Sequence, residues 1–81
     1  MEIDRRSDVP PYLQAAEQLR ARIRVGEITD RLPSAVDIAN EAGIAVLTAR
    51  RALQVVVQDG YAYVRTGMGT YVTPRDEWPK G

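Results

Sequence analysis

The sequence contains no cysteine and no histidine among its 81 residues. Without cysteine there is no disulfide and no thiolate nucleophile, and without either residue the usual zinc sites are excluded. The absence of histidine also removes the commonest general base at neutral pH. The carboxylates show no grouping that indicates catalysis. We therefore expect a protein that is not an enzyme, with no catalytic residue, no metal site and no cofactor.

Long apolar runs are also missing. The first nine residues are charged and lack the apolar stretch of a secretory signal. No run approaches the roughly eighteen apolar residues of a membrane-spanning helix. A chain of 81 residues with 44% hydrophobic residues is typical of one globular domain. We therefore expect a cytoplasmic protein without a membrane partner.

Excess charge of either sign is absent, because eleven Lys and Arg residues balance eleven Asp and Glu residues. This balance counts mildly against strong non-specific binding of nucleic acid, which draws on a basic surplus. Lys80 is the single lysine, so ten of the eleven cations are arginine. Arginine favours bidentate pairing with phosphate, guanine or carboxylate. A GC-rich genome explains the same bias equally well.

The first helical pattern follows a flexible lead-in over residues 1–10. Pro11 suits the first turn of a helix. Apolar residues then recur at spacings of four and three up to Gly26, which ends the pattern; they are Tyr12, Ala16, Leu19 and Ile23. One face of an amphipathic helix is therefore predicted to be buried. The arginines Arg20, Arg22 and Arg24 late in this helix indicate a solvated face or, alternatively, a phosphate contact.

Two further helices are predicted after a short connection in which Leu32 is expected to be buried. Ser34 and Asp37 form a capping-box pattern for a short helix that ends at Gly43. The next helix runs from Val46 to Gln58, with a buried stripe of Ala49, Ala52, Leu53 and Val56. Val55 and Val57 are expected to be shielded by the first helix or by the segment that follows.

The apolar period changes to two after Gly60. Residues 61–64 and 70–72 are rich in aromatic and β-branched side chains, and residues 65–69 between them contain two glycines. This pattern predicts a β-hairpin. The domain is expected to span residues 11–73, followed by a frayed tail over residues 74–81.

The order of these elements defines the predicted fold. Two helices joined by a tight glycine turn form a helix-turn-helix unit, whose second helix can enter the major groove of DNA. With one helix before it and a hairpin after it, the unit becomes a three-helix winged helix-turn-helix with a C-terminal β-hairpin wing. The fold class is α+β, mainly α.

Short motifs run through these predicted elements. They are Gly26-Glu27-Ile28, Arg31-Leu32-Pro33-Ser34, Asp37-Ile38-Ala39, Gly43-Ile44, Thr48-Ala49-Arg50-Arg51-Ala52-Leu53, Asp59-Gly60 and Gly67-Met68-Gly69-Thr70-Tyr71-Val72. With them, the segment from Tyr12 to Val72 resembles the N-terminal DNA-binding domain of bacterial GntR-type transcriptional regulators. The resemblance implies a winged helix-turn-helix that binds double-stranded DNA.

The sequence departs from the family pattern at three places. Ala35-Val36 stands where the family usually has Glu-Arg, whose arginine reaches DNA. Ala45-Val46-Leu47 stands where Ser/Thr-Arg-Thr usually opens the recognition helix. Nine residues follow Val72, where family members usually continue into an effector-binding and dimer-forming domain. We therefore expect no small-molecule effector, and we leave open a homodimer or a cooperative array on DNA.

Several side chains are candidates for DNA contact, each with a structural alternative. Arg51 is expected to face the groove and Arg50 to hold a phosphate, unless both belong to an ordinary solvated helix face. Leu47 either touches a thymine methyl or joins a protein-binding patch with Val46 and Val55. Ser34 caps a helix whose N-terminus can also donate to phosphate. The predicted DNA-binding residues are Ser34, Leu47, Thr48, Arg50, Arg51, Gln54, Arg65, Thr66, Gly67 and Thr70.

The sequence evidence is weaker for two residues, Gly67 and Arg31. Gly67 in the wing is explained equally by the backbone angles of a turn. Arg31 either contacts DNA or pairs with Asp30 or Glu27, and it is not among the predicted DNA-binding residues. The function predicted is that of a sequence-specific DNA-binding transcriptional regulator, either a repressor or an accessory factor. The alternative is a winged-helix module for protein interaction with weak or no DNA binding.

Overall fold

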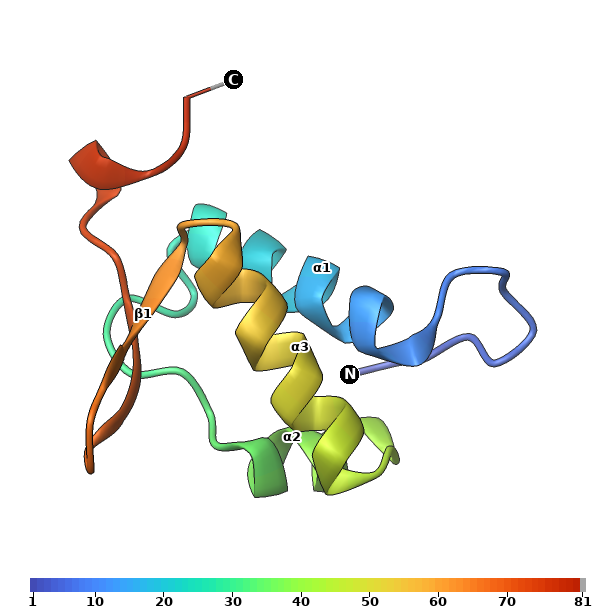
Figure 1. Ribbon diagram of the computed structural model, residues 1–81. Coiled ribbons are helices and arrows are strands. Elements are labelled where there is room, and N and C mark those ends of the chain that lie inside the picture. The colour runs from blue at the N-terminus through green and yellow to red at the C-terminus, as the bar shows by residue number, and fades with distance from the viewer. Residues whose placement is uncertain (81) are drawn as a thin grey trace.

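The computed structural model describes residues 1–80, in which three α-helices precede a two-stranded hairpin (Figure 1). The elements are α1 (Pro11–Arg24), α2 (Ala35–Ala42), α3 (Val46–Gln58), β1 (Ala62–Arg65), β2 (Gly69–Val72) and the 3-10 turn η1 (Arg75–Glu77). The prediction of a mainly helical α+β winged helix-turn-helix is confirmed. Along residues 1–80, no helix is both long and apolar enough to cross a membrane.

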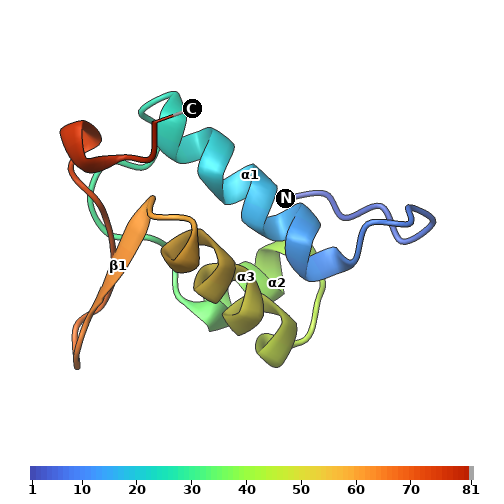
Figure 2. The ribbon, with the colours of Figure 1, turned by 45° about the horizontal axis from the view of Figure 1, so that its top comes forward.

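The core lies where α1 and α2 pack against α3 (Figure 2). Its largest fully buried side chains are Leu19 and Ile23 of α1, Ile38 of α2 and Val56 of α3. The predicted buried stripe of α3 is confirmed at Ala49, Ala52 and Val56, and Leu32 is also buried. Leu53 departs from the prediction and is only partly buried, because it borders an open groove between α3 and the hairpin.

The turn between α2 and α3 sets the helix-turn-helix geometry. Ser34 caps α2 as predicted, since its Oγ accepts a hydrogen bond from the Asp37 N–H at 3.1 Å. Gly43 ends α2 in the left-handed region with φ +67°, where its N–H donates to the Ala39 carbonyl. Helix α3 starts three residues later. Its N-cap residue, Ala45, makes no side-chain cap bond.

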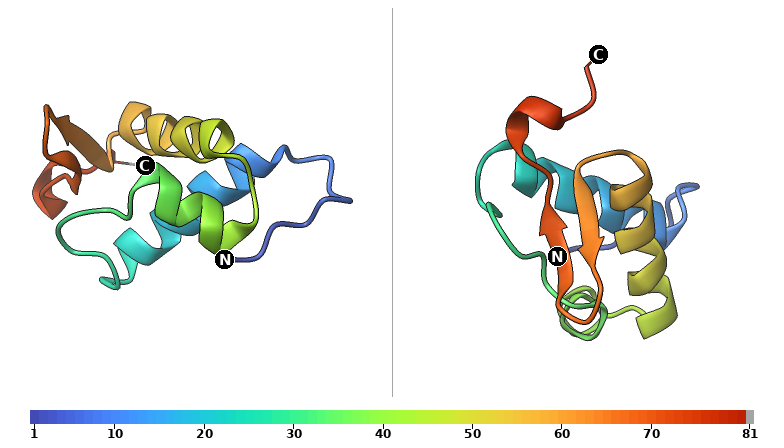
Figure 3. Two further views of the ribbon diagram at one scale, coloured as in Figure 1. Left: turned by 90° about the horizontal axis from the view of Figure 1, so that it is seen from below. Right: turned by 60° about the vertical axis from the view of Figure 1, so that its left-hand side comes forward.

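The connection between α1 and α2 pairs with β2 through an isolated β-bridge, which the sequence did not predict. The Leu32 N–H donates to the Thr70 carbonyl at 2.8 Å, and the Val72 N–H donates to the Asp30 carbonyl at 2.7 Å. Arg31 thereby forms an isolated antiparallel bridge with Tyr71. Figure 3 shows this connection running alongside the hairpin. The two hydrogen bonds tie the wing to the start of α2.

The first ten residues are held by two side chains of α1, Gln14 and Gln18, and the Gln18 amide donates to the Glu2 carbonyl. The Gln14 amide donates to the carbonyls of Asp4 at 2.8 Å and Val9 at 2.7 Å, and its oxygen accepts from the Asp4 N–H at 2.8 Å. Met1 and Ile3 also pack against the core. The expectation that this lead-in is flexible concerns its motion in solution and stays a prediction.

Residues 74–80 fold back on the domain through Trp78. Its ring meets Tyr61 edge-on with 5.6 Å between centroids, and its Nε1–H donates to the Thr73 carbonyl at 2.6 Å. Arg75 donates to the Arg24 carbonyl at 3.1 Å, at the C-terminal end of α1. The sequence, which led us to expect a frayed end, did not predict these contacts.

We expect that Leu19→Ala lowers the free energy of unfolding by about 2–5 kcal/mol, because it removes a fully buried side chain between α1 and α3. Urea denaturation followed by circular dichroism measures this loss. The matched control is Val25→Ala, whose side chain is 78% exposed and should change stability by less than about 0.5 kcal/mol. Equal effects from the two variants would contradict this account of the core.

Candidate nucleic-acid interface

Helix α3 and the wing together form a groove. It has a volume of about 640 Å³ and lies between one side of α3, the start of α2 and the hairpin. The structure brings three predicted site residues together there: Arg50 and Gln54 from α3 and Thr70 from β2. Ala35 and Val64 line the groove beside them. With Gln58, which also lines the groove, this arrangement presents one cation and three hydrogen-bonding side chains along a single hollow.

Arg51 lies on a different side of α3 from Arg50. Its guanidinium carbon is 4.1 Å from the centroid of the Tyr12 ring, which comes from the first turn of α1. Thr48 and Arg51 border a second hollow of about 490 Å³, which Arg5 also lines. Because successive helical residues are about 100° apart, neighbouring arginines diverge. The predicted contacts of α3 are therefore divided between the wing side and the α1 side.

The first turn of α3 carries apolar side chains to the surface between these two sides. Leu47 is 72% exposed, and Val46 is partly exposed at 39%. Neither side chain has a hydrogen-bonding atom. Leu47 thus lies at the surface as predicted, without a place in either hollow.

The tip of the wing is a loop of three residues, Thr66, Gly67 and Met68, all exposed. It closes with a hydrogen bond from the Met68 N–H to the Arg65 carbonyl at 2.8 Å. Arg65 belongs to β1 and pairs with Gly69 of β2. Each strand therefore extends one residue further toward the tip of the wing than the sequence predicted. The Arg65 guanidinium carbon is 4.8 Å from the centroid of the Tyr71 ring. The stacking holds this cation along the wing.

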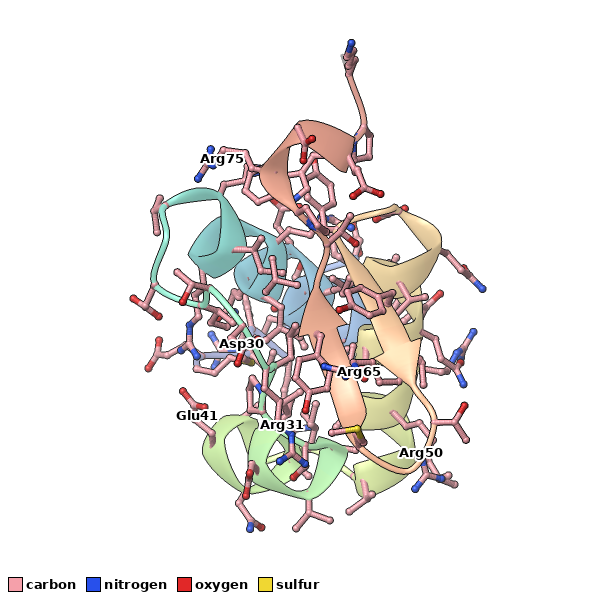
Figure 4. All side chains as sticks on the ribbon, turned by 90° about the vertical axis from the view of Figure 1, so that its left-hand side faces the viewer. Asp30, Arg31, Glu41, Arg50, Arg65 and Arg75 are labelled. Carbon is pink, nitrogen blue, oxygen red and sulfur yellow. The ribbon has the colours of Figure 1, made fainter. Side chains whose placement is uncertain are left out.

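Arg31 is a candidate contact that the predicted set leaves out. A Cβ atom on Gly69, where φ is +122°, would lie 2.9 Å from the Arg31 Nε, so the guanidinium rests against the wing backbone. Arg31 also lines a hollow with Ser34 and Asp37. Figure 4 shows Arg31, Arg65 and Arg50 around the hairpin. The Arg31-Leu32-Pro33-Ser34 motif is the sequence signal for it, since it places Arg31 just before the cap of α2.

Ion pairs neutralise two arginines of α1, Arg20 and Arg22, and leave those near the wing unpaired. Arg20 pairs with Glu17 and Asp59, and Arg22 pairs with Glu27 at 3.2 Å and Glu41 at 2.9 Å. Among residues 1–80, no carboxylate pairs with the four arginines beside α3 and the wing, namely Arg31, Arg50, Arg51 and Arg65. The net charge of zero is therefore unevenly distributed. In the same range, no three side chains are grouped so that they could hold a metal ion.

These pairs also shift the pKa values of the acids. A hydrogen bond from Arg20 lowers the pKa of Glu17, and a hydrogen bond from Arg22 lowers the pKa of Glu41. Burial opposes both shifts but does not reverse them. Glu17 and Glu41 consequently stay charged and stay engaged with the arginines of α1 near neutral pH.

The fold and this surface define a winged helix-turn-helix domain. The family model of the bacterial regulatory proteins of the gntR family matches residues 11–72, and the chain belongs to this family. It is 39% identical over 75 residues to the HTH-type transcriptional repressor NagR of Bacillus subtilis (strain 168), covering 90% of this chain and 31% of NagR. It is 39% identical over 66 residues to the uncharacterized HTH-type transcriptional regulator YdcR of Escherichia coli (strain K12), covering 79% and 14%. The chain thus spans less than a third of either curated relative.

Solved structures agree with this family assignment. YtrA from Sulfolobus acidocaldarius, a GntR-family transcription factor, superposes with a TM-score of 0.81 at 31% identity, over 90% of this chain and 79% of YtrA. The DNA-binding domain of AraR in complex with operator ORE1 gives a TM-score of 0.76 at 26% identity, over 88% and 89%. The resemblance stated from the sequence motifs is confirmed.

We expect the Arg22–Glu41 pair to stabilise the fold only while Glu41 is ionised. Because the folded pKa lies below the unfolded value of about 4.3, the stabilisation is present above that value and disappears as the pH falls through the folded pKa. Glu41→Gln should therefore cost about 0.2–1 kcal/mol at pH 7, as exposed pairs do, and progressively less as the pH is lowered from 7 through the folded pKa of Glu41. Urea denaturation of both proteins across this range measures the difference. A cost that does not change with pH would contradict the pairing.

Proposed function

We propose that the chain is a sequence-specific DNA-binding regulator of transcription, a repressor or an accessory factor. In this proposal α3 enters the major groove and the wing lies on the DNA backbone. The observation that carries it is the groove that joins Arg50 and Gln54 of α3 to Thr70 of the wing. The AraR DNA-binding domain, which is held by its operator in a solved complex of similar fold, supports it.

The residues take different roles in this arrangement. Arg50 holds a phosphate at the edge of the groove, while Gln54 reaches a base edge. Arg65, Thr66, Gly67 and Thr70 steady the wing on the backbone.

The remaining contacts come from the two sides of this groove. Ser34 occupies the Asp37 N–H as the cap of α2, the other N–H groups of this first turn donate to a phosphate, and Arg31 adds a cation beside them. Thr48 and Arg51 reach the phosphates on the α1 side of α3.

One such domain covers a single half-site. Because a lone module of this size binds weakly, we propose that two copies act together on DNA, as a homodimer or as a cooperative array on repeats. The compartment proposed is the cytoplasm, where bacterial DNA is found.

Replacing one arginine tests the placement on DNA. Fluorescence anisotropy with the upstream region of the gene and with a random duplex, across a salt series, gives the affinity and its salt slope. Arg50→Ala should weaken binding to both duplexes and reduce the slope of log K against log salt by about 0.9, because one phosphate contact is lost. The melting temperature should not change, since Arg50 is exposed.

Arg24→Ala is the matched control. It removes the same charge from the C-terminal end of α1, which lies at the opposite end of the domain from the start of α3 (Figure 1). Its salt slope should equal that of the parent. If Arg24→Ala reduces the slope and Arg50→Ala does not, DNA binds to a different face.

A second candidate function is favoured by the exposure of Leu47 at 72%. A winged-helix module that binds a protein would use this apolar surface in place of base-reading side chains. In that case Leu47→Asp should abolish self-association or partner binding in light scattering and leave DNA affinity unchanged. Under the proposal above, the same variant should weaken DNA binding, because it brings a carboxylate close to phosphates.

A further inference from the structure

Three apolar side chains near the groove are exposed, and we name them together the apolar ridge. They are Val36 of α2 and Val46 and Leu47 of α3, exposed at 54%, 39% and 72%. Val46 lies four residues before Arg50 and therefore on the same side of α3. Val36 is flanked in sequence by Ala35 and Asp37. Ala35 lines the groove with Arg50, and Asp37 lines the hollow with Arg31. The apolar ridge thus adjoins the surface that is proposed to meet DNA.

The charges around the apolar ridge favour nucleic acid as its occupant. Arg31, Arg50 and Arg65 lie on its wing side, and Arg51 lies on its α1 side. In the described chain these guanidinium groups have no carboxylate partner. Asp37 is the acidic exception near the apolar ridge, in the first turn of α2. Cations on both sides of an apolar strip match a major groove, which has a phosphate backbone on each side.

The chemistry of the apolar ridge narrows what it can recognise. Aliphatic side chains neither donate nor accept hydrogen bonds, so they cannot distinguish the polar atoms of base edges. The apolar group that a base pair presents in the major groove is the C5 methyl of thymine. Burying a methyl group against Leu47 is favourable, whereas burying a polar base atom there without a partner is unfavourable.

We propose that the apolar ridge reads thymine methyl groups and that Leu47, its most exposed member, makes the main contact. The inference rests on the proposed function and adds the class of base that the first turn of α3 selects. The half-site should therefore carry thymine where this turn enters the groove.

Uracil substitution tests the inference, because uracil differs from thymine only by the missing methyl. Duplexes are first enriched from a random pool on the protein, and each thymine of the best duplex is then replaced in turn. We expect uracil at one or two positions to weaken binding about fourfold each, the value of one buried methyl group, and to have no effect elsewhere.

A protein variant links that position to Leu47. Leu47→Ala should lower affinity for the thymine duplex and bring the uracil penalty at the contacted position close to onefold. Val25→Ala removes an equally exposed aliphatic side chain at the end of α1, and the fourfold penalty should remain. Circular dichroism melting shows that both variants are folded.

The outcomes separate the two proposals. Failure to enrich any duplex overturns the DNA-binding proposal itself. An enriched duplex that tolerates uracil at every position overturns the thymine inference and leaves DNA binding in place. Loss of self-association in Leu47→Ala, with no uracil effect, assigns the apolar ridge to a second copy of the chain and also overturns the inference.

Discussion

Burial of one stripe of α3 is the constraint on which the domain depends. Ala49, Ala52 and Val56 are fully buried, and the small side chains of the two alanines let α1 approach α3 closely. Once this stripe is fixed against Leu19 and Ile23, the rotation of α3 about its own axis is also fixed. Every other residue of α3 then has one direction in which it can point. A shift of the buried stripe by one residue along the sequence would rotate α3 and turn a different set of side chains outward.

That rotation explains why neighbouring residues of α3 contact different parts of the domain. Arg50 lines the groove with the wing, whereas Arg51 stacks on Tyr12 of α1. The stack is worth about 0.5–1 kcal/mol at an exposed site, which is enough to orient a side chain without removing it from solvent. The wing is fixed in a similar way by the two hydrogen bonds between residues 30–32 and β2. The groove therefore has two walls that are both tied to the core.

The features that could be predicted from the sequence are those encoded by neighbours along the chain. The period of Tyr12, Ala16, Leu19 and Ile23 predicts α1, and Ser34 with Asp37 predicts the start of α2. The contacts that were missed join residues far apart in sequence, such as Trp78 on Tyr61 and Arg31 against Gly69. No local period encodes such pairs, because they depend on where the core places each element. For the same reason the sequence predicted that Arg51 faces the groove of DNA but not that it stacks on Tyr12 of α1.

The uneven distribution of charge reconciles a net charge of zero with a DNA-binding domain. The ion pairs of Arg20 and Arg22 use four of the eleven carboxylates on surfaces other than the groove between α3 and the wing. The four unpaired arginines near α3 and the wing would correspond to a salt slope of only about −3 to −4 if each met one phosphate. In the proposed complex with DNA, a small electrostatic contribution of this kind would give weak binding to random sequences. Affinity for a particular site must then come largely from contacts with base edges, which makes the exposed first turn of α3 more important for discrimination than it would be in a strongly basic domain.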